Sequence, residues 1–227
     1  MLDRIQKLGL TELDIEELSK FQSRDGFKLL KDKEFNQVDK FFRQFPVYSN
    51  LIPLLTDGNS NYWCVYIDNE MHGMICYCSH EEASLEPRFR STTSLLTAIN
   101  KNTAAYDFHE LPLNAFDFPS FGDTNNTHKY KGLVEKLKHN LAIEKDEDIR
   151  QQLAFSIIAL SSIDDIEANI YPLLADENMY IQERAIQILG FHKYKPAKEK
   201  LIALKKTTMP NGQTVIEIAL KNITQSN

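Results

Sequence analysis

The chain has 227 residues, of which 42% are hydrophobic and 26% are charged, and its formal net charge is -6 at neutral pH. This composition is ordinary for a globular protein and excludes a low-complexity chain, a collagen-like rod and a disulfide-stapled scaffold. No apolar run approaches the roughly 20 residues that a membrane-spanning helix needs, and the N-terminus lacks the layout of a signal peptide, so we expect a cytoplasmic protein.

The acidic excess lies entirely in the first part of the chain. Residues 1–129 contain 13 Lys and Arg against 19 Asp and Glu, whereas residues 130–227 contain 13 of each kind. Nucleic-acid binding depends on clustered basic side chains that displace counterions, so this distribution argues against a nucleic-acid partner. It is compatible with a basic protein partner that the acidic part attracts, and equally with a charge that only maintains solubility.

The first elements in chain order are two helices within residues 11–45. Thr11 and Asp14 have the spacing of an N-terminal cap, and apolar residues follow at near-helical spacing. A second apolar stripe begins at Phe35, and Pro46 ends it. Both stripes are typical of helices that bury one face in a core.

Two strands and another helix are expected next. A dense turn signal over residues 56–61 precedes residues 62–67, which are rich in aromatic and β-branched side chains and include Trp63, an expected core residue. A loop leads to a second strand at residues 74–78, and the two strands are expected to form an antiparallel hairpin or meander. Residues 92–99 have the pattern of a capped helix.

Residues 106–129 are the expected connector between two domains. They contain Pro112, Pro119 and Gly122 and end in a polar run, which is typical of a boundary. Aromatic side chains are also scattered through the segment, and a free linker rarely carries so many. We therefore expect this connector to pack against one or both of its neighbours.

The last part of the chain, residues 130–227, has a helical pattern that repeats. Three apolar triplets with the spacing i, i+4, i+8 recur at steps of 32 and 34 residues: Ile149, Leu153 and Ile157; Ile181, Ala185 and Leu189; Val215, Ala219 and Ile223. Each triplet follows another amphipathic stretch, at residues 133–143, 166–175 and 201–204. The pattern predicts stacked helix–turn–helix pairs, with an irregular bundle of three pairs as the alternative.

Three cysteines lie close together in the sequence: Cys64, Cys76 and Cys78. Alternation along a strand would put Cys76, Cys78 and His80 on one face, where Cys64 or His72 could complete a thiolate and imidazole metal site. His80 could also serve as a base for a nucleophilic Cys78. However, Cys-x-Cys on an extended strand holds its sulfurs about 6–7 Å apart, whereas zinc sites use Cys-x-x-Cys on a tight turn. We expect free, buried and inert thiols, with no metal and no cofactor.

Catalytic motifs are missing from the sequence. It contains no Gly-rich phosphate loop, no His-Glu-x-x-His and no strand–turn–helix nucleophile elbow. The paired acids Glu81/Glu82 and Asp164/Asp165 fall where turns or helix starts are expected, and acids are common there for structural reasons. We therefore expect a protein that is not an enzyme and has no catalytic residues. A small hydrolase or metal-dependent enzyme built on the cysteines and histidines just named is the remote alternative.

Residues 51–63 read LIPLLTDGNSNYW and are followed by Val65-Tyr66-Ile67, Gly73-Met74-Ile75 and His80-Glu81-Glu82. This series resembles the SUKH superfamily, which includes fungal cell-wall-assembly regulators and many bacterial immunity proteins. The resemblance covers roughly residues 10–105. It implies an α+β domain over residues 1–105, with an antiparallel or mixed sheet flanked by helices.

A second resemblance lies in the repeats. Residues 172–178 read PLLADEN and are followed by Ile181, Arg184-Ala185 and Leu189-Gly190, which is similar to the HEAT repeat. The first unit departs from that repeat because Leu153 stands where Ala is usual, and the last unit has an insert at residues 207–213 between its helices. The resemblance implies an all-α HEAT-like solenoid over residues 130–227, with a curved protein-binding surface.

Both resemblances imply binding rather than catalysis. The function they imply is that of a bacterial immunity protein that neutralises a toxin, for example a basic nuclease, by direct binding. A scaffold or regulatory adaptor of the host cell is the alternative. The candidate partner-binding residues are the polar side chains of loops beside the sheet, each of which could instead serve only to form its turn: Asp57, Asn59, Asn61, Glu81 and Glu82. The resemblances leave the oligomeric state open.

Overall fold

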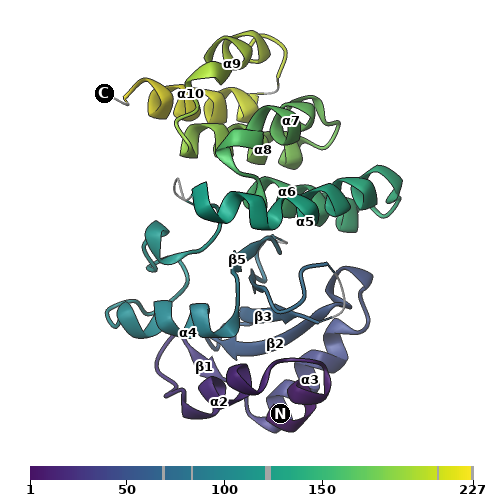
Figure 1. Cartoon of the computed structure of the whole chain (residues 1–227), viewed down its shortest axis with the longest axis vertical. Coiled ribbons are helices and arrows are strands. Elements are labelled where there is room, and N and C mark those ends of the chain that lie inside the picture. The colour runs from purple at the N-terminus through teal and green to yellow at the C-terminus, as the bar shows by residue number, and fades with distance from the viewer. Residues whose placement is uncertain (68–69, 83, 121–123, 209, 226–227) are drawn as a thin grey trace. The chain divides into compact units, whose positions relative to one another are not determined.

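The computed structural model describes residues 1–67, 70–82, 84–120, 124–208 and 210–225, and for residues 124–129 it describes the backbone alone. The chain divides into two compact units, Met1–Pro119 and Ser120–Asn227 (Figure 1). The division falls inside the segment 106–129 that was expected to connect two domains. Within the described residues, every helix is too short or too polar to cross a bilayer.

The first unit is built on a five-stranded antiparallel sheet in which each strand pairs with the next along the chain. The expected hairpin is confirmed, because Trp63 pairs with Tyr77 and Cys64 with Cys76. Three strands were not predicted: the two short outer ones, β1 and β5, have too few residues to show a period, and β2 is a continuous apolar run without alternation. The strands are β1 (Lys28–Leu29), β2 (Leu51–Thr56), β3 (Tyr62–Tyr66), β4 (Ile75–Cys78) and β5 (Pro87–Phe89).

Along the chain, helices precede the sheet, follow it and separate β1 from β2. The expected cap is present: Thr11 Oγ1 accepts a hydrogen bond from the Asp14 N–H at 3.1 Å, and an Asp14 carboxylate oxygen accepts one from the Thr11 N–H at 3.2 Å. The described helices of this unit are α1 (Leu2–Lys7), which was not predicted, α2 (Glu12–Lys20), α3 (Asp32–Phe42) and α4 (Thr92–Lys101), with 3-10 turns at Pro46–Tyr48 and Leu113–Ala115.

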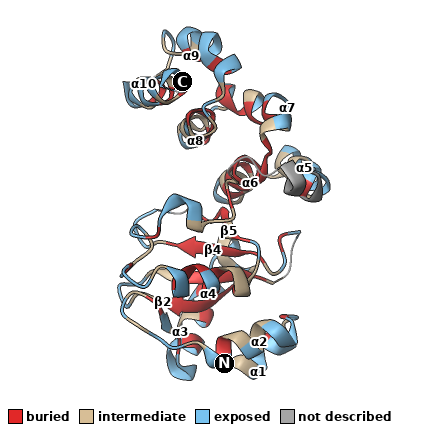
Figure 2. Ribbon diagram, turned by 60° about the vertical axis from the view of Figure 1, so that its left-hand side comes forward, coloured by how far each residue is buried: buried red, intermediate tan, exposed pale blue. Residues whose placement is uncertain are grey.

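An aromatic cluster fills the core on one face of the sheet. Trp63 is 1% exposed and its ring centroid lies 5.0 Å from that of Tyr77 and 5.5 Å from those of Phe89 and Phe108. Phe108 also stacks on Tyr77 with centroids 4.2 Å apart and planes 7° apart. β4 is buried along its whole length (Figure 2). Residues after α4 therefore complete the core of the first unit.

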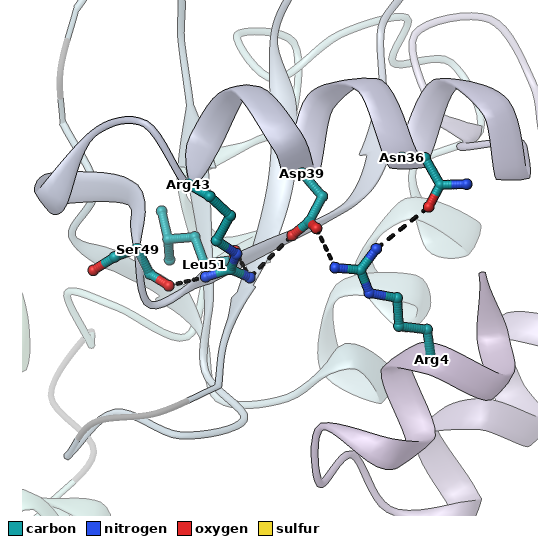
Figure 3. A network of polar contacts seen from close by, with 6 residues as sticks. All are labelled: Arg4, Asn36, Asp39, Arg43, Ser49 and Leu51. Atoms are coloured by element: carbon teal, nitrogen blue, oxygen red, sulfur yellow. Dashed lines mark hydrogen bonds and ion pairs between the residues drawn. The ribbon is translucent and has the colours of Figure 1, made fainter.

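A buried carboxylate joins α1, α3 and the start of β2 (Figure 3). The side chain of Asp39 is 3% exposed and forms ion pairs with Arg4 on α1 and, at 3.0 Å, with Arg43 beyond the end of α3. Arg4 also donates to Asn36, and Arg43 donates to the carbonyl oxygens of Ser49 and Leu51. Each charge of this network is thus satisfied by partners from a different part of the unit.

Arg24, in the segment between α2 and β1, binds the C-terminal end of α4. Its guanidinium donates to the carbonyl oxygens of Ile99 at 3.1 Å and Asn102 at 2.9 Å, and also to that of Ala105. These carbonyls lie at the C-terminal end of α4 and just beyond it, where backbone carbonyls carry partial negative charge. The guanidinium carbon lies 4.7 Å from the ring centroid of Phe27. The cation therefore interacts with an aromatic ring as well as with the carbonyl oxygens.

The second unit is helical. α6 packs against α8 and α8 against α10, while α5 packs against α6, the Tyr171–Ala175 turn against α8, and α9 against α10. The described elements are α5 (Thr124–Ile143), α6 (Glu147–Leu160), α7 (Ile166–Ile170), α8 (Met179–Phe191), α9 (Lys198–Leu204) and α10 (Pro210–Thr224), with 3-10 turns at Ile163–Asp165, Tyr171–Ala175 and Lys195–Ala197.

The three apolar triplets fall in α6, α8 and α10, as the periodicity predicts. Two details differ from the prediction. The stretch 166–175 is not one helix, because it changes to a 3-10 turn at Tyr171, next to Pro172. The insert expected at residues 207–213 is shorter, because α10 already begins at Pro210. Proline suits a first helical position, where no backbone N–H donor is needed.

Candidate protein-interaction surface

The five predicted contact residues lie at one end of the sheet. Asp57, Asn59 and Asn61 occupy the turn between β2 and β3, while Glu81 and Glu82 follow β4. The two loops are neighbours because Tyr62, at the start of β3, pairs with Cys78, at the end of β4. Asn59, Glu81 and Glu82 are exposed, and the other two are partly exposed. These five residues together with His80 are called the acidic rim.

Asp57 organises the first loop of the acidic rim. One of its carboxylate oxygens accepts hydrogen bonds from the backbone N–H of Asn59 at 2.7 Å and, more weakly, of Asn61 at 3.4 Å. The other oxygen accepts one from the Asn61 side-chain amide at 2.7 Å. Gly58 has a φ of +89°, which favours glycine. Asp57 and Asn61 therefore do form the turn, as the structural alternative to a binding role expected. These hydrogen bonds also fix the positions of both side chains.

Asn61 connects the first loop to the second. Its Oδ1 accepts a hydrogen bond from the backbone N–H of His80 at 2.8 Å and lies 2.8 Å from Nδ1 of the same residue. Nε2 of His80 is 3.9 Å from Oε1 of Glu81. Asp57, Asn61 and His80 thus form a chain of hydrogen bonds across the rim. From the sequence, His80 was named in the SUKH-like series and in the remote metal and hydrolase alternatives, but this role of joining the two loops was missed.

Tyr77 lies on β4 beside the acidic rim. Burial is the main cause that raises the pKa of its hydroxyl, and the carboxylates of Asp57, Asp107 and Glu81 raise it further, together with Cys78. Asp107 belongs to the segment after α4 and accepts hydrogen bonds from the backbone N–H groups of His109 and Glu110. Sequence reasoning missed Asp107, since its distance from Asp57 along the chain carries no signal of proximity in the fold.

The cysteines are free and buried. Burial, and then the neighbouring Cys76, raise the pKa of Cys78 to about 12, and burial also raises the pKa of Cys64 well above its usual value. These thiols are protonated at neutral pH, whereas the thiolate is the form that attacks or binds metal. Among the residues that the structure describes, no three His, Cys, Asp or Glu side chains are placed to hold a metal ion.

Comparison with known proteins assigns no family to the chain. No protein-family model matches the sequence, and no curated protein and no solved structure is similar enough to match. What the chain does must therefore be inferred from the acidic rim and its surroundings.

Proposed function

We propose that this chain is a non-catalytic, cytoplasmic protein-binding protein, and specifically a bacterial immunity protein that neutralises a toxin by binding it directly. The observation that carries the proposal is the acidic rim, in which the hydrogen bonds of Asp57, Asn61 and His80 hold two loops together at one end of the sheet. The carboxylate of Asp57, which is fixed in this way, costs little ordering entropy on binding, so it favours recognition of a complementary basic surface.

The charge distribution supports a basic partner. The first unit, Met1–Pro119, contains 12 Lys and Arg against 18 Asp and Glu, which accounts for the whole net charge of -6. A field of this sign accelerates the encounter with a cationic protein and repels nucleic acid. A nuclease toxin suits this surface, because its own substrate site must be basic. Binding there would block the substrate without any chemistry by the immunity protein.

The finer fold assignments belong to the same proposal. The antiparallel meander with helices before and after it is compatible with a SUKH-like domain. The successive packing of α6, α8 and α10 is compatible with a HEAT-like solenoid. The expected boundaries, residues 1–105, 106–129 and 130–227, are part of this assignment. In this proposal the first unit recognises the partner by charge, and the second offers a further protein-binding surface.

The experiment is affinity capture from native lysate with the full chain as bait, followed by expression of the captured protein with and without this chain. We expect a partner that kills cells alone and is harmless in the presence of the chain. A stable partner that is not lethal would favour the adaptor function instead. Absence of any captured protein from cells that express the candidate toxins would overturn the proposal.

A charge-reversal variant tests the role of the acidic rim. With the captured partner in hand, Glu81→Lys combined with Glu82→Lys should slow association and weaken its dependence on salt. The matched control reverses two exposed acids of the second unit, Glu177 and Glu199, and changes the net charge equally. Equal association rates for the two double variants would show that the position of the charge is irrelevant.

A further inference from the structure

We propose that His80 is a pH-sensitive switch of the acidic rim: when its ring gains a proton, Nε2 binds the carboxylate of Glu81, and the rim attracts a basic partner less strongly. This inference rests on the proposed function and adds to it the regulation of the same surface. His80 follows β4, and half of its side chain is exposed, so the ring can exchange protons with water.

Asn61 fixes which nitrogen of the ring carries a hydrogen. The carboxylate of Asp57 accepts hydrogen bonds, so the end of the Asn61 amide that lies 2.7 Å from it is the nitrogen. The other end is Oδ1, which has no hydrogen to donate. It accepts the backbone N–H of His80 at 2.8 Å, and Nδ1 of the ring lies at the same distance. Nδ1 therefore carries a hydrogen in the neutral ring as well as in the protonated one.

Nε2 is the nitrogen that is left to titrate. In the neutral ring it has no hydrogen, and Oε1 of Glu81 lies 3.9 Å from it, beyond the usual hydrogen-bond distance of about 2.7–3.2 Å. Protonation turns Nε2 into a charged donor that attracts this carboxylate. The side chain of Glu81 is 80% exposed, so it is free to move closer.

The charged groups around the ring are all acidic. Asp57 lies behind Asn61 in the first loop, and Glu81 and Glu82 follow His80 in the second. These three carboxylates give the rim a formal charge of -3, and a proton on His80 changes it to -2. Nδ1 donates to Asn61 in both forms, so the two loops stay joined. Acid therefore changes the charge of the rim without separating its loops, and it weakens the attraction of a cation.

The first test determines the tautomer by NMR on the full chain labelled with 15N histidine. At pH 8 we expect the His80 ring to carry its hydrogen on Nδ1 alone. On titration to pH 5.5, Nε2 should gain a proton and the backbone amide of Glu81 should shift with the same midpoint. His139, an exposed residue of α5, is the internal control and should populate both tautomers when neutral.

The second test measures binding of the full chain to a hexalysine peptide at low salt, at pH 8 and at pH 5.5. Imidazoles titrate in this range, whereas carboxylates ordinarily stay ionised. Wild-type binding should weaken in acid roughly two- to five-fold more than that of His80→Gln, which is the effect of one surface ion pair. His139→Gln is the matched control and should keep the wild-type pH dependence. Both variants retain His192, so the acid sensitivity of the second unit is common to them.

A neutral His80 ring with its hydrogen on Nε2, or an equal pH dependence for the wild type and His80→Gln, would overturn the inference. Neither test needs a toxin, so the two proposals fail in different ways. The expected tautomer and pH dependence without any lethal partner would support the switch and remove the proposed function. A neutralised toxin that binds equally well at pH 8 and pH 5.5 would do the reverse.

Discussion

A Cβ atom placed on Gly190 would lie 2.8 Å from the Cα and 3.0 Å from the Cβ of Ala219. α8 and α10 therefore approach each other at a distance that only a glycine at position 190 and a small residue at position 219 allow. The sequence pattern contains both residues, as the end of a Leu-Gly pair and as the middle of the third apolar triplet. The structure shows that they meet.

Gly190→Ala should destabilise the second unit. Its methyl group would meet backbone rather than a flexible side chain, so the helices must separate, at a cost of about 1–3 kcal/mol. Gly132→Ala is the matched control on α5, because nothing lies within 4 Å of the new Cβ and alanine is the better helix former. Urea unfolding should therefore show opposite shifts for the two variants. A Gly190→Ala protein as stable as the wild type would contradict the close approach.

Ala185→Trp tests the register of the repeats. Ala185 is fully buried in α8, so an indole there should overfill the unit and cost about 1–3 kcal/mol or more of unfolding free energy. Gln187→Trp on the same helix is the control, since Gln187 is exposed. Thermal unfolding should separate the two variants. If both unfold at the same temperature, Ala185 does not face the core.

Gly26→Ala should be among the most damaging substitutions in the first unit. Gly26 has a φ of +77°, and an added Cβ would lie 1.4 Å from the carbonyl oxygen of Tyr106. Gly58 and Gly73 also have positive φ, but nothing lies within 4 Å of a Cβ there. Gly58→Ala and Gly73→Ala therefore measure the backbone strain alone, about 1 kcal/mol. We expect Gly26→Ala to give much less folded protein than either control in expression and circular dichroism experiments, and equal yields would refute the clash.

His192, at the end of α8, should make the second unit sensitive to acid. Burial lowers its pKa to about 4, from an unfolded value near 6.5, so the folded state favours the neutral ring. The neutral His192 ring therefore contributes to the free energy of unfolding above about pH 6.5, and this contribution is lost as the pH falls toward 4. It amounts to no more than about 3 kcal/mol.

His192→Gln should flatten the decline in stability between pH 6.5 and 4 that urea unfolding measures for the wild type. His139→Gln is the control, because His139 is an exposed residue of α5. A wild type and a His192→Gln variant with the same pH profile would show that His192 does not carry the acid sensitivity.

Periodic features of the fold were predictable from the sequence. Within a single helix or strand, the spacing of the apolar residues reveals the element. This holds for the helices around Leu18 and Phe35, for the β3–β4 hairpin and for the three apolar triplets. Trp63 was expected in the core and is buried there. β1 and β5 were missed because two or three residues show no period, and β2 because its continuous apolar run has no alternation. α1 was missed because its six residues bury only Ile5.

The candidate site was predictable only in part. Asp57, Asn59, Asn61, Glu81 and Glu82 follow from loop position, and their two loops do meet. Tyr77 and Asp107 were not predicted as site residues. Tyr77 has the pattern of an ordinary strand residue, and Asp107 lies in a segment whose packing depends on tertiary contacts. The stack of Phe108 on Tyr77 joins them, and nothing in local sequence specifies that pairing.

The same stack has a consequence for synthesis on the ribosome. β3 and β4 leave the exit tunnel well before residues 106–110, yet the ring of Tyr77 gains its stacking partner, Phe108, only when that later segment arrives. Domains fold as units during translation, so the nascent sheet must wait for Phe108 before its aromatic face is covered. The aromatic face of the sheet is therefore covered only after the chain has grown past residues 106–110.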